Sequence, residues 1–133
     1  MFIIVGCTNN HKIYLTDKYY NSGDLISIEP GDIKDNETFI LYTYNNFCAL
    51  PVHCEEIFKE VFEKYKIDAL SIPFEEFKKT IYYEKVKYAP SIIIISNGKI
   101  VAFLDANSNE DLEKYQDVSK FEEWLNNNIN LKK

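Results

Sequence analysis

The sequence predicts one α/β domain built on a sheet that is partly antiparallel. Short apolar runs typical of buried strands alternate with longer stretches that carry apolar residues at helical spacing. The pair Asn97-Gly98, a strong signal for a two-residue hairpin turn, lies between two such runs. The chain has 133 residues, which is enough to bury a real core but too few for two domains.

The beginning of the chain is predicted to be an arm outside this domain. Residues 1–24 combine a short apolar start with a polar stretch that is rich in Asn and Tyr and has no sustained period. We expect an N-terminal arm or strand over residues 1–24 that docks through Tyr14, Tyr19 and Tyr20. The α/β domain itself is expected to cover residues 25–133.

Five runs are predicted to be strands because they are rich in β-branched and aromatic residues and are bounded by turn signals. The run after Pro90 contains four consecutive isoleucines, which indicates a buried strand. The predicted strands cover residues 25–28, 38–44, 67–72, 92–95 and 100–104.

Two helices are predicted between these strands. The first covers residues 51–65, because Pro51 suits a first helical position and acidic residues follow early, where they favour the helix dipole. The second begins at Pro73 and carries apolar residues at helical spacing as far as Ile81.

A further helix is predicted near the end of the chain. Ser119 and Glu122 have the spacing of a capping box, in which each side chain accepts a hydrogen bond from the other residue's backbone N–H. The acidic stretch 107–117 before this helix is expected to be a solvated insertion.

Composition excludes several classes of function. The net charge is -6, so no basic stripe is available to neutralise phosphates, and a nucleic-acid partner is not expected. All 15 basic residues are lysines, so the chain cannot bind a carboxylate or phosphate with an arginine fork. No apolar stretch approaches the 18 or so residues that span a bilayer.

The sequence around Cys7 leaves two interpretations open. Residues 4–7, Ile-Val-Gly-Cys, resemble the end of a bacterial lipoprotein signal, whose cysteine becomes acylated, but the charged start and longer apolar core of such a signal are missing. If a longer leader exists, Cys7 is the lipidated first residue of an extracytoplasmic, membrane-anchored protein. Otherwise residues 2–5 form a buried strand, Cys7 is structural and the protein is cytoplasmic.

Cys48 and Pro90 carry a resemblance to a known family. Cys48 lies between a central strand and a helical pattern, and Ala89-Pro90 directly precedes the isoleucine strand. With the strand, Asn-Gly turn, strand and helix that follow Pro90, this order resembles the thioredoxin fold over residues 25–128. Within that family it is similar to small bacterial thioredoxin-like lipoproteins and bacteriocin-accessory-type proteins, whose active-site cysteines vary. The resemblance implies a central mixed β-sheet flanked by helices.

The cysteine pattern departs from the Cys-x-x-Cys of this family, because Pro51 occupies the position of the second cysteine and the next cysteine is Cys54. A cysteine at a helix amino end is favoured as thiolate, so Cys48 is the candidate attacking thiol. Cys54 is the candidate resolving thiol, although it also lies on the apolar face of the helix, where it would pack as a small hydrophobic residue.

Whether Cys48 and Cys54 can form a disulfide depends on where the helix begins. In one continuous helix they would be about 9 Å apart along the axis and would point in different directions, which excludes the bond. If the helix begins at Pro51, the loop that carries Cys48 can fold back over the first turn, and the bond is feasible.

The resemblance also implies roles for neighbouring residues. A cis bond is implied between Ala89 and Pro90, with the Ala89 backbone pairing with an extended substrate peptide. The buried acid that assists the second cysteine in thioredoxins is replaced by Tyr42, and His53 could act as a base instead.

No metal site or cofactor is expected. The possible ligands Cys7, His11, Cys48, His53 and Cys54 match no common zinc spacing. Two hypotheses about function follow. The first is a thiol–disulfide redox protein that acts on thiols or disulfides of a protein or peptide partner. The alternative is a non-catalytic accessory module that presents a peptide groove near Ala89 and Pro90.

Overall fold

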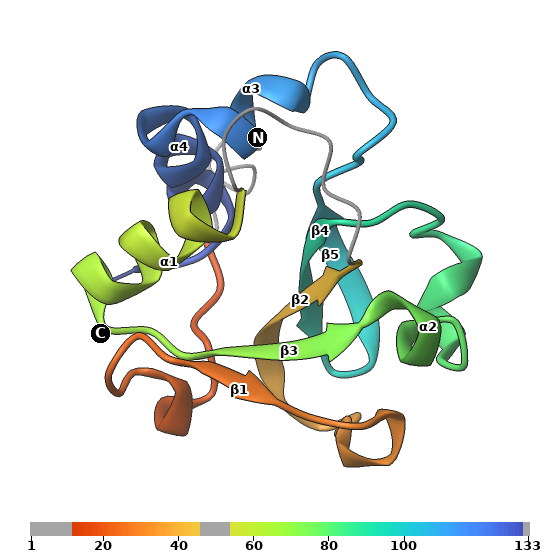
Figure 1. Ribbon diagram of the computed structural model, residues 1–133. Coiled ribbons are helices and arrows are strands. Elements are labelled where there is room, and N and C mark those ends of the chain that lie inside the picture. Colours follow the sequence, from red (N-terminus) through yellow and green to blue (C-terminus); the bar gives the residue numbers. More distant parts are fainter. Residues whose placement is uncertain (1–11, 46–53, 132–133) are drawn as a thin grey trace, which may run out of the picture.

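The computed structural model describes residues 12–45 and 54–131, in which a five-stranded mixed sheet runs through the centre (Figure 1). The spatial order of the strands is β1-β3-β2-β4-β5. β3 is parallel to both β1 and β2, whereas β4 is antiparallel to β2 and to β5. The strands are β1 (Leu25–Ser27), β2 (Thr38–Tyr44), β3 (Ala69–Pro73), β4 (Ser91–Ser96) and β5 (Lys99–Phe103).

Helices cover both faces of this sheet. In Figure 1, α1 and α4 lie on one side of the strands and α2 lies on the other. The prediction of a mixed sheet flanked by helices is thus confirmed. The helices are α1 (Cys54–Tyr65), α2 (Phe74–Phe77), α3 (Leu112–Gln116) and α4 (Val118–Asn128). None of the helices in the described ranges is long and apolar enough to cross a membrane.

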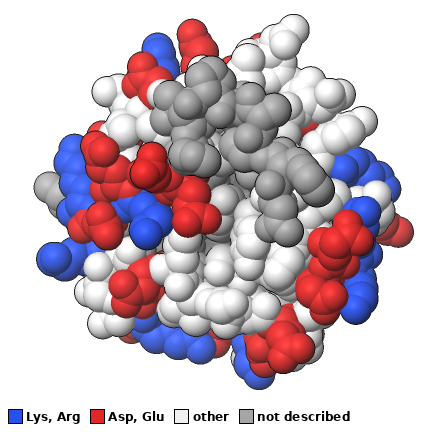
Figure 2. Space-filling view, viewed as in Figure 1, with Lys and Arg blue, Asp and Glu red and all other residues white. Residues whose placement is uncertain are grey.

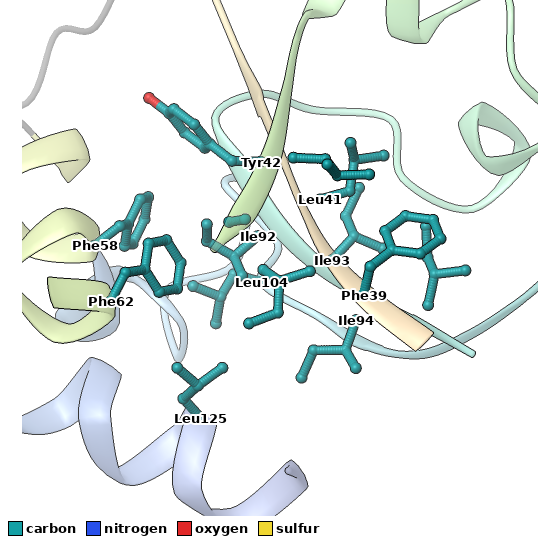
Figure 3. Close-up of a cluster of buried hydrophobic side chains, with 14 of the residues drawn as sticks. Phe39, Leu41, Tyr42, Phe58, Phe62, Ile92, Ile93, Ile94, Leu104 and Leu125 are labelled. Carbon is teal, nitrogen blue, oxygen red and sulfur yellow. The ribbon is translucent and has the colours of Figure 1, made fainter. Parts of the chain in front are cut away.

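Much of the core is built on the central strand β2 and its neighbour β4. Their side chains are buried on both faces because helices cover each side of the sheet. Figure 3 shows Phe58 and Phe62 of α1 and Leu125 of α4 turned toward Ile92 and Leu104. The hairpin between β4 and β5 is confirmed: Asn97 and Gly98 both have positive φ, as a tight two-residue turn requires.

Two helix predictions were wrong in detail. α2 ends at Phe77, and Ile81 lies in a separate 3₁₀ helix with 73% of its surface exposed. Thr80 explains the break, because its hydroxyl donates to the Phe77 carbonyl and accepts from the Tyr82 N–H. It therefore ends one helical segment and caps the next.

The cap of α4 also differs from the prediction. The side chain of Asp117 accepts hydrogen bonds from the backbone N–H groups of Ser119 and Lys120, at 2.8 and 3.3 Å. Asp117 is therefore the N-cap, and Ser119 is the second residue of the helix.

Residues 12–24 pack closely against the sheet and its helices. Tyr19 is buried, and Tyr20 donates a hydrogen bond to the Asn130 carbonyl, but Tyr14 is 58% exposed and does not dock as predicted. Leu15, which was not singled out, is buried instead. The Ile13 backbone pairs with Ile129 at the end of α4.

Candidate functional site

The candidate site lies where the carboxyl end of β2 meets the amino end of β4. Thr43 pairs with Ser91 across the antiparallel ladder, so the segments that follow β2 and precede β4 lie at the same edge of the sheet. Pro90 is directly before β4, a position suited to a residue that cannot donate to the ladder. The peptide bond between Ala89 and Pro90 is cis, and Pro90 is buried.

Asn45 joins these two segments directly. Its side-chain amide donates a hydrogen bond to the Ala89 carbonyl, with Nδ2 and O 3.3 Å apart. The bond is exposed to solvent, so a strand-like partner could compete with it for the Ala89 carbonyl. Asn45 precedes Cys48 by three residues.

Cys54 lies at the start of the described part of α1, on the face of the helix that contacts the core. Its side chain is only 3% exposed. Phe58, one helical turn further along, is fully buried, as expected for residues at this spacing on one helix face. The packing role predicted for Cys54 therefore agrees with its burial.

Tyr115 connects Phe58 of α1 to Pro90. Its ring meets that of Phe58 edge-on, with centroids 5.8 Å apart. Its hydroxyl donates to the Pro90 carbonyl at 2.6 Å and lies 3.1 Å from the Leu104 carbonyl oxygen. The Ser91 hydroxyl donates to the same Leu104 carbonyl at 2.7 Å, so a small buried polar network lies beneath the cis bond.

Burial raises the pKa of the Tyr115 hydroxyl well above its usual value, nearby acidic groups such as Asp111 raise it further, and a hydrogen bond with the Ser91 side chain opposes this rise. Tyr115 was missed by sequence reasoning, since it lies in the acidic stretch that was expected to be solvated. A single aromatic residue among the charges was the only signal.

The position at which the resemblance implies a buried acid is occupied by Tyr42. This side chain is buried, and its ring lies between those of Tyr44 and Phe58, at centroid distances of 5.5 and 5.7 Å. In Figure 3 its hydroxyl points away from the hydrophobic cluster. Residue 42 therefore supplies an aromatic packing surface and no carboxylate at this point of β2.

The predicted site residues divide into two groups. Ala89 and Pro90 lie beside the end of β2, and Tyr115 connects Pro90 to the start of α1, where Cys54 lies. Cys48 and Cys7 lie outside the described residues, as do Pro51, His11 and His53. Within residues 12–45 and 54–131, no group of three or more His, Cys, Asp or Glu side chains could hold a metal ion.

A small cavity lies beside the segment that leads to Ala89. Its volume is about 170 Å³. Tyr88, the residue before Ala89, lines it and is half exposed. The other lining residues are Lys85, Val86, Lys87, Phe103 and Asp105.

On the face of the molecule shown in Figure 2, acidic side chains and lysines are interspersed around the edge, with uncharged residues between them.

Solved structures with the same fold are thioredoxins. The chain is similar to the thioredoxin pre-protein of Schistosoma mansoni, with 22% identity, coverage of 80% of this chain and 99% of that chain, and a TM-score of 0.55. It is also similar to oxidised thioredoxin from Plasmodium falciparum, with 17% identity, coverage of 73% of this chain and 97% of that chain, and a TM-score of 0.50. The long form of spinach chloroplast thioredoxin f gives 15% identity, coverage of 82% and 99%, and a TM-score of 0.50.

These similarities show that the chain has a thioredoxin-like fold, and at such identities they show the fold alone. No protein-family model matches the sequence. No curated protein gives a significant match either.

Proposed function

We propose that the protein is a thiol–disulfide redox protein in which Cys48 attacks and Cys54 resolves. The hydrogen bond from Asn45 to Ala89 carries this proposal, because it holds the segment that leads to Cys48 against the residue before Pro90. Cys48 follows Asn45 by three residues, and three residues of fully extended chain span at most about 11 Å, so the proposal requires its thiol to act close to this edge of the sheet. Cys54 begins α1, and Phe58 on the same face of this helix contacts Tyr115, whose hydroxyl donates to the Pro90 carbonyl.

The reaction is a two-step exchange. The Cys48 thiolate attacks one sulfur of the partner's disulfide, the S–S bond breaks, and the first partner thiolate leaves with one electron pair. The Cys54 thiolate then attacks the Cys48 sulfur in the mixed disulfide, and the second partner thiolate leaves. The partner gains two electrons, and the protons lost by the two cysteines end on its thiols. An external dithiol returns the oxidised protein to its reduced state.

The burial of Cys54 suits the second step. A thiol that is 3% exposed is poorly accessible to a large partner, so it is protected from direct attack. An attack on the Cys48 sulfur within the same chain does not require a partner to reach Cys54 from solvent. The proposal therefore requires the two sulfur atoms of this chain to meet, and it does not require Cys54 to admit a protein partner.

The proposal is tested by counting thiols in the oxidised protein before and after reduction. We expect the oxidised chain to lose two thiols reversibly, and peptide mapping to identify them as Cys48 and Cys54. Cys48→Ser should abolish reduction of a model protein disulfide, Cys54→Ser should trap a mixed disulfide, and Cys7→Ser should behave as the unchanged control. Full activity of Cys48→Ser, or no reversible loss of thiols, would contradict the proposal.

The cavity beside Ala89 favours a second candidate, a binding module that presents a peptide groove without turnover. Half-exposed Tyr88 borders the cavity directly before Ala89, so a bound peptide could pair with the Ala89 backbone and contact the cavity. A chain carrying both Cys48→Ser and Cys54→Ser would then still bind its peptide partner, and Tyr88→Ala would weaken that binding. Loss of partner capture in the double cysteine variant would exclude this candidate.

Membrane anchoring through Cys7 is a separate proposal about location. It predicts an acylated cysteine at this position in the protein purified from its natural source. Intact-mass measurement distinguishes acylated from unmodified Cys7. An unmodified Cys7 in the protein from its natural source would contradict the proposal.

A further inference from the structure

We infer that the cavity beside Ala89 selects an extended acidic peptide, in which one aromatic side chain enters the cavity and acidic residues near it contact Lys85 and Lys87. The inference rests on the proposed function, because it names the class of partner that the Ala89 edge takes, whether the protein is a redox protein or a binding module. Recognition at this cavity involves neither Cys48 nor Cys54.

The cavity has the size and lining to hold one aromatic side chain. Its volume is about 170 Å³. A cavity of about 150 Å³ with apolar walls is large enough to bind benzene. Val86 is buried, Phe103 is partly buried and Tyr88 is half exposed, so the lining is largely apolar. The rings of Tyr88 and Phe103 can meet an inserted ring edge-on or with an offset, which are the favoured arrangements of aromatic pairs.

The two lysines that line the cavity are available to a ligand. The neighbouring Lys78 and Lys79 each pair with the glutamate three residues before, at 3.2 and 3.1 Å. Lys85 and Lys87 are exposed, and neither forms an ion pair with another residue in the described part of the chain. In a chain whose net charge is -6, these two side chains favour an acidic partner over a basic one.

Asp105 is the acidic residue of the lining, and it leaves the balance of charge positive. Its Oδ1 accepts a hydrogen bond from the Asn107 N–H at 2.9 Å, within its own loop. Glu84 precedes Lys85 in the sequence but does not line the cavity. The lining therefore carries two positive charges against one negative charge, and a carboxylate of the ligand is most stable beside the lysines.

Lys87 is held in position by aromatic packing. Its Nζ lies 4.5 Å from the centroid of the Tyr83 ring, a distance at which the ring attracts a cation. That ring meets Phe74 of α2 edge-on, with centroids 5.9 Å apart. Because Lys87 is already ordered, it loses less side-chain freedom when it binds a carboxylate.

The edge at Ala89 determines which residues of the peptide face the cavity. A peptide that pairs with the Ala89 backbone as an extra strand passes beside Tyr88. In an extended chain alternate side chains lie on the same face. The acidic residues that reach the lysines are therefore two positions before and two positions after the aromatic residue.

The test measures binding of a synthetic peptide to the reduced full chain by fluorescence anisotropy. The probe is fluorescein-labelled Gly-Glu-Ser-Phe-Ser-Glu-Gly, which contains no cysteine. We expect it to bind about tenfold more tightly than a matched peptide with glutamine in place of both glutamates, and the difference should shrink as salt is added. Alanine in place of the phenylalanine should weaken binding by a similar factor, because the cavity is then left unfilled.

Reversal of charge locates the site. The double variant Lys85→Glu with Lys87→Glu should bind the acidic peptide about tenfold more weakly and should gain affinity for a peptide with lysine in place of both glutamates. Lys59→Glu with Lys120→Glu makes the same change in net charge on exposed positions of α1 and α4 and is the control. Tyr88→Phe should retain binding.

Three results would overturn the inference: equal affinity for the acidic and the glutamine peptides, an equal loss of affinity in the two double variants, or no binding of the acidic peptide by the parent chain. Equally tight binding of the acidic and glutamine peptides would support a peptide groove while excluding selection by charge. Thiol counting decides the redox proposal separately, since the probe has no cysteine.

Discussion

At the scale of single residues, Asp68 shows how one carboxylate organises its surroundings. It is buried directly before β3, and its Oδ1 accepts hydrogen bonds from the backbone N–H groups of Ser22, Gly23 and Asp24 at 2.9 to 3.2 Å. Asn21 donates to its other oxygen. Burial raises the pKa of Asp68, but these hydrogen bonds outweigh burial, and the net pKa lies below the usual value.

Because its folded pKa is lowered, Asp68 should stabilise the fold only when ionised. This contribution is fully present above the unfolded pKa of about 3.9 and is lost as the pH falls through the folded pKa. We expect Asp68→Asn to lower the free energy of unfolding by about 1–2 kcal/mol at neutral pH, and the difference from the parent to shrink in acid. Urea unfolding at a series of pH values measures this. Glu60→Gln on the exposed face of α1 is the control, and a difference that persists unchanged in acid would contradict the expectation.

At the scale of elements, the ends of helices were the hardest features to predict. Asp117 and Ser119 are both residue types that cap helices, and each precedes an apolar face at plausible spacing. Local sequence alone does not choose between them. The choice depends on where the chain leaves α3 and turns into α4, since Asp117 is also the residue that follows α3.

The two candidate caps can be separated by mutation. Asp117→Ala removes the acceptor for the N–H groups of Ser119 and Lys120 and should lower the free energy of unfolding by about 1 kcal/mol. Ser119→Ala removes an exposed hydroxyl and should change it by less than about 0.5 kcal/mol. Thermal or urea unfolding of both variants gives the comparison, and a larger loss from Ser119→Ala would restore the capping box that the sequence predicted.

The features that could be predicted at this scale are those determined by residues adjacent in the sequence. The isoleucine strand and the Asn97-Gly98 turn were found because periodicity and turn chemistry are properties of adjacent residues. Tyr115 was missed because its partners are distant: the Pro90 carbonyl is 25 residues away and the Leu104 carbonyl 11. The part of the site that depends on α3 meeting β4 has no local signature.

At the scale of the whole molecule, residues 12–24 tie together elements that are distant in the sequence. The Thr16 N–H donates to the carbonyl of Thr38, the first residue of β2, and the N–H of Asn130, which follows α4, donates to the Ile13 carbonyl. Gly23 has a positive φ of 90°, and a Cβ at this position would lie 2.7 Å from the Glu63 Cα, so this segment passes directly against the backbone of α1. Residues 12–24 therefore form part of the core packing and do not only lie on the surface of the domain.

A chain restricted to residues 25–133, the domain that the sequence predicted, should for this reason be much less stable than the full chain. It would lose Leu15 and Tyr19, which are 2% and 5% exposed. At about 1.5–3 kcal/mol for each buried side chain, the loss is comparable to much of the 5–15 kcal/mol by which a typical domain is stable.

Circular dichroism and urea unfolding of residues 25–133 beside the full chain measure this loss, and two point variants of the full chain show whether packing causes it. Leu15→Ala should lower the free energy of unfolding by about 2–5 kcal/mol, because it leaves a cavity in a closed core. Tyr14→Ala, at the adjacent position with its side chain 58% exposed, should change it by less than about 0.5 kcal/mol. If residues 25–133 unfold at the same urea concentration as the full chain, the arm contributes nothing to the core and the boundary at Leu25 is the correct one.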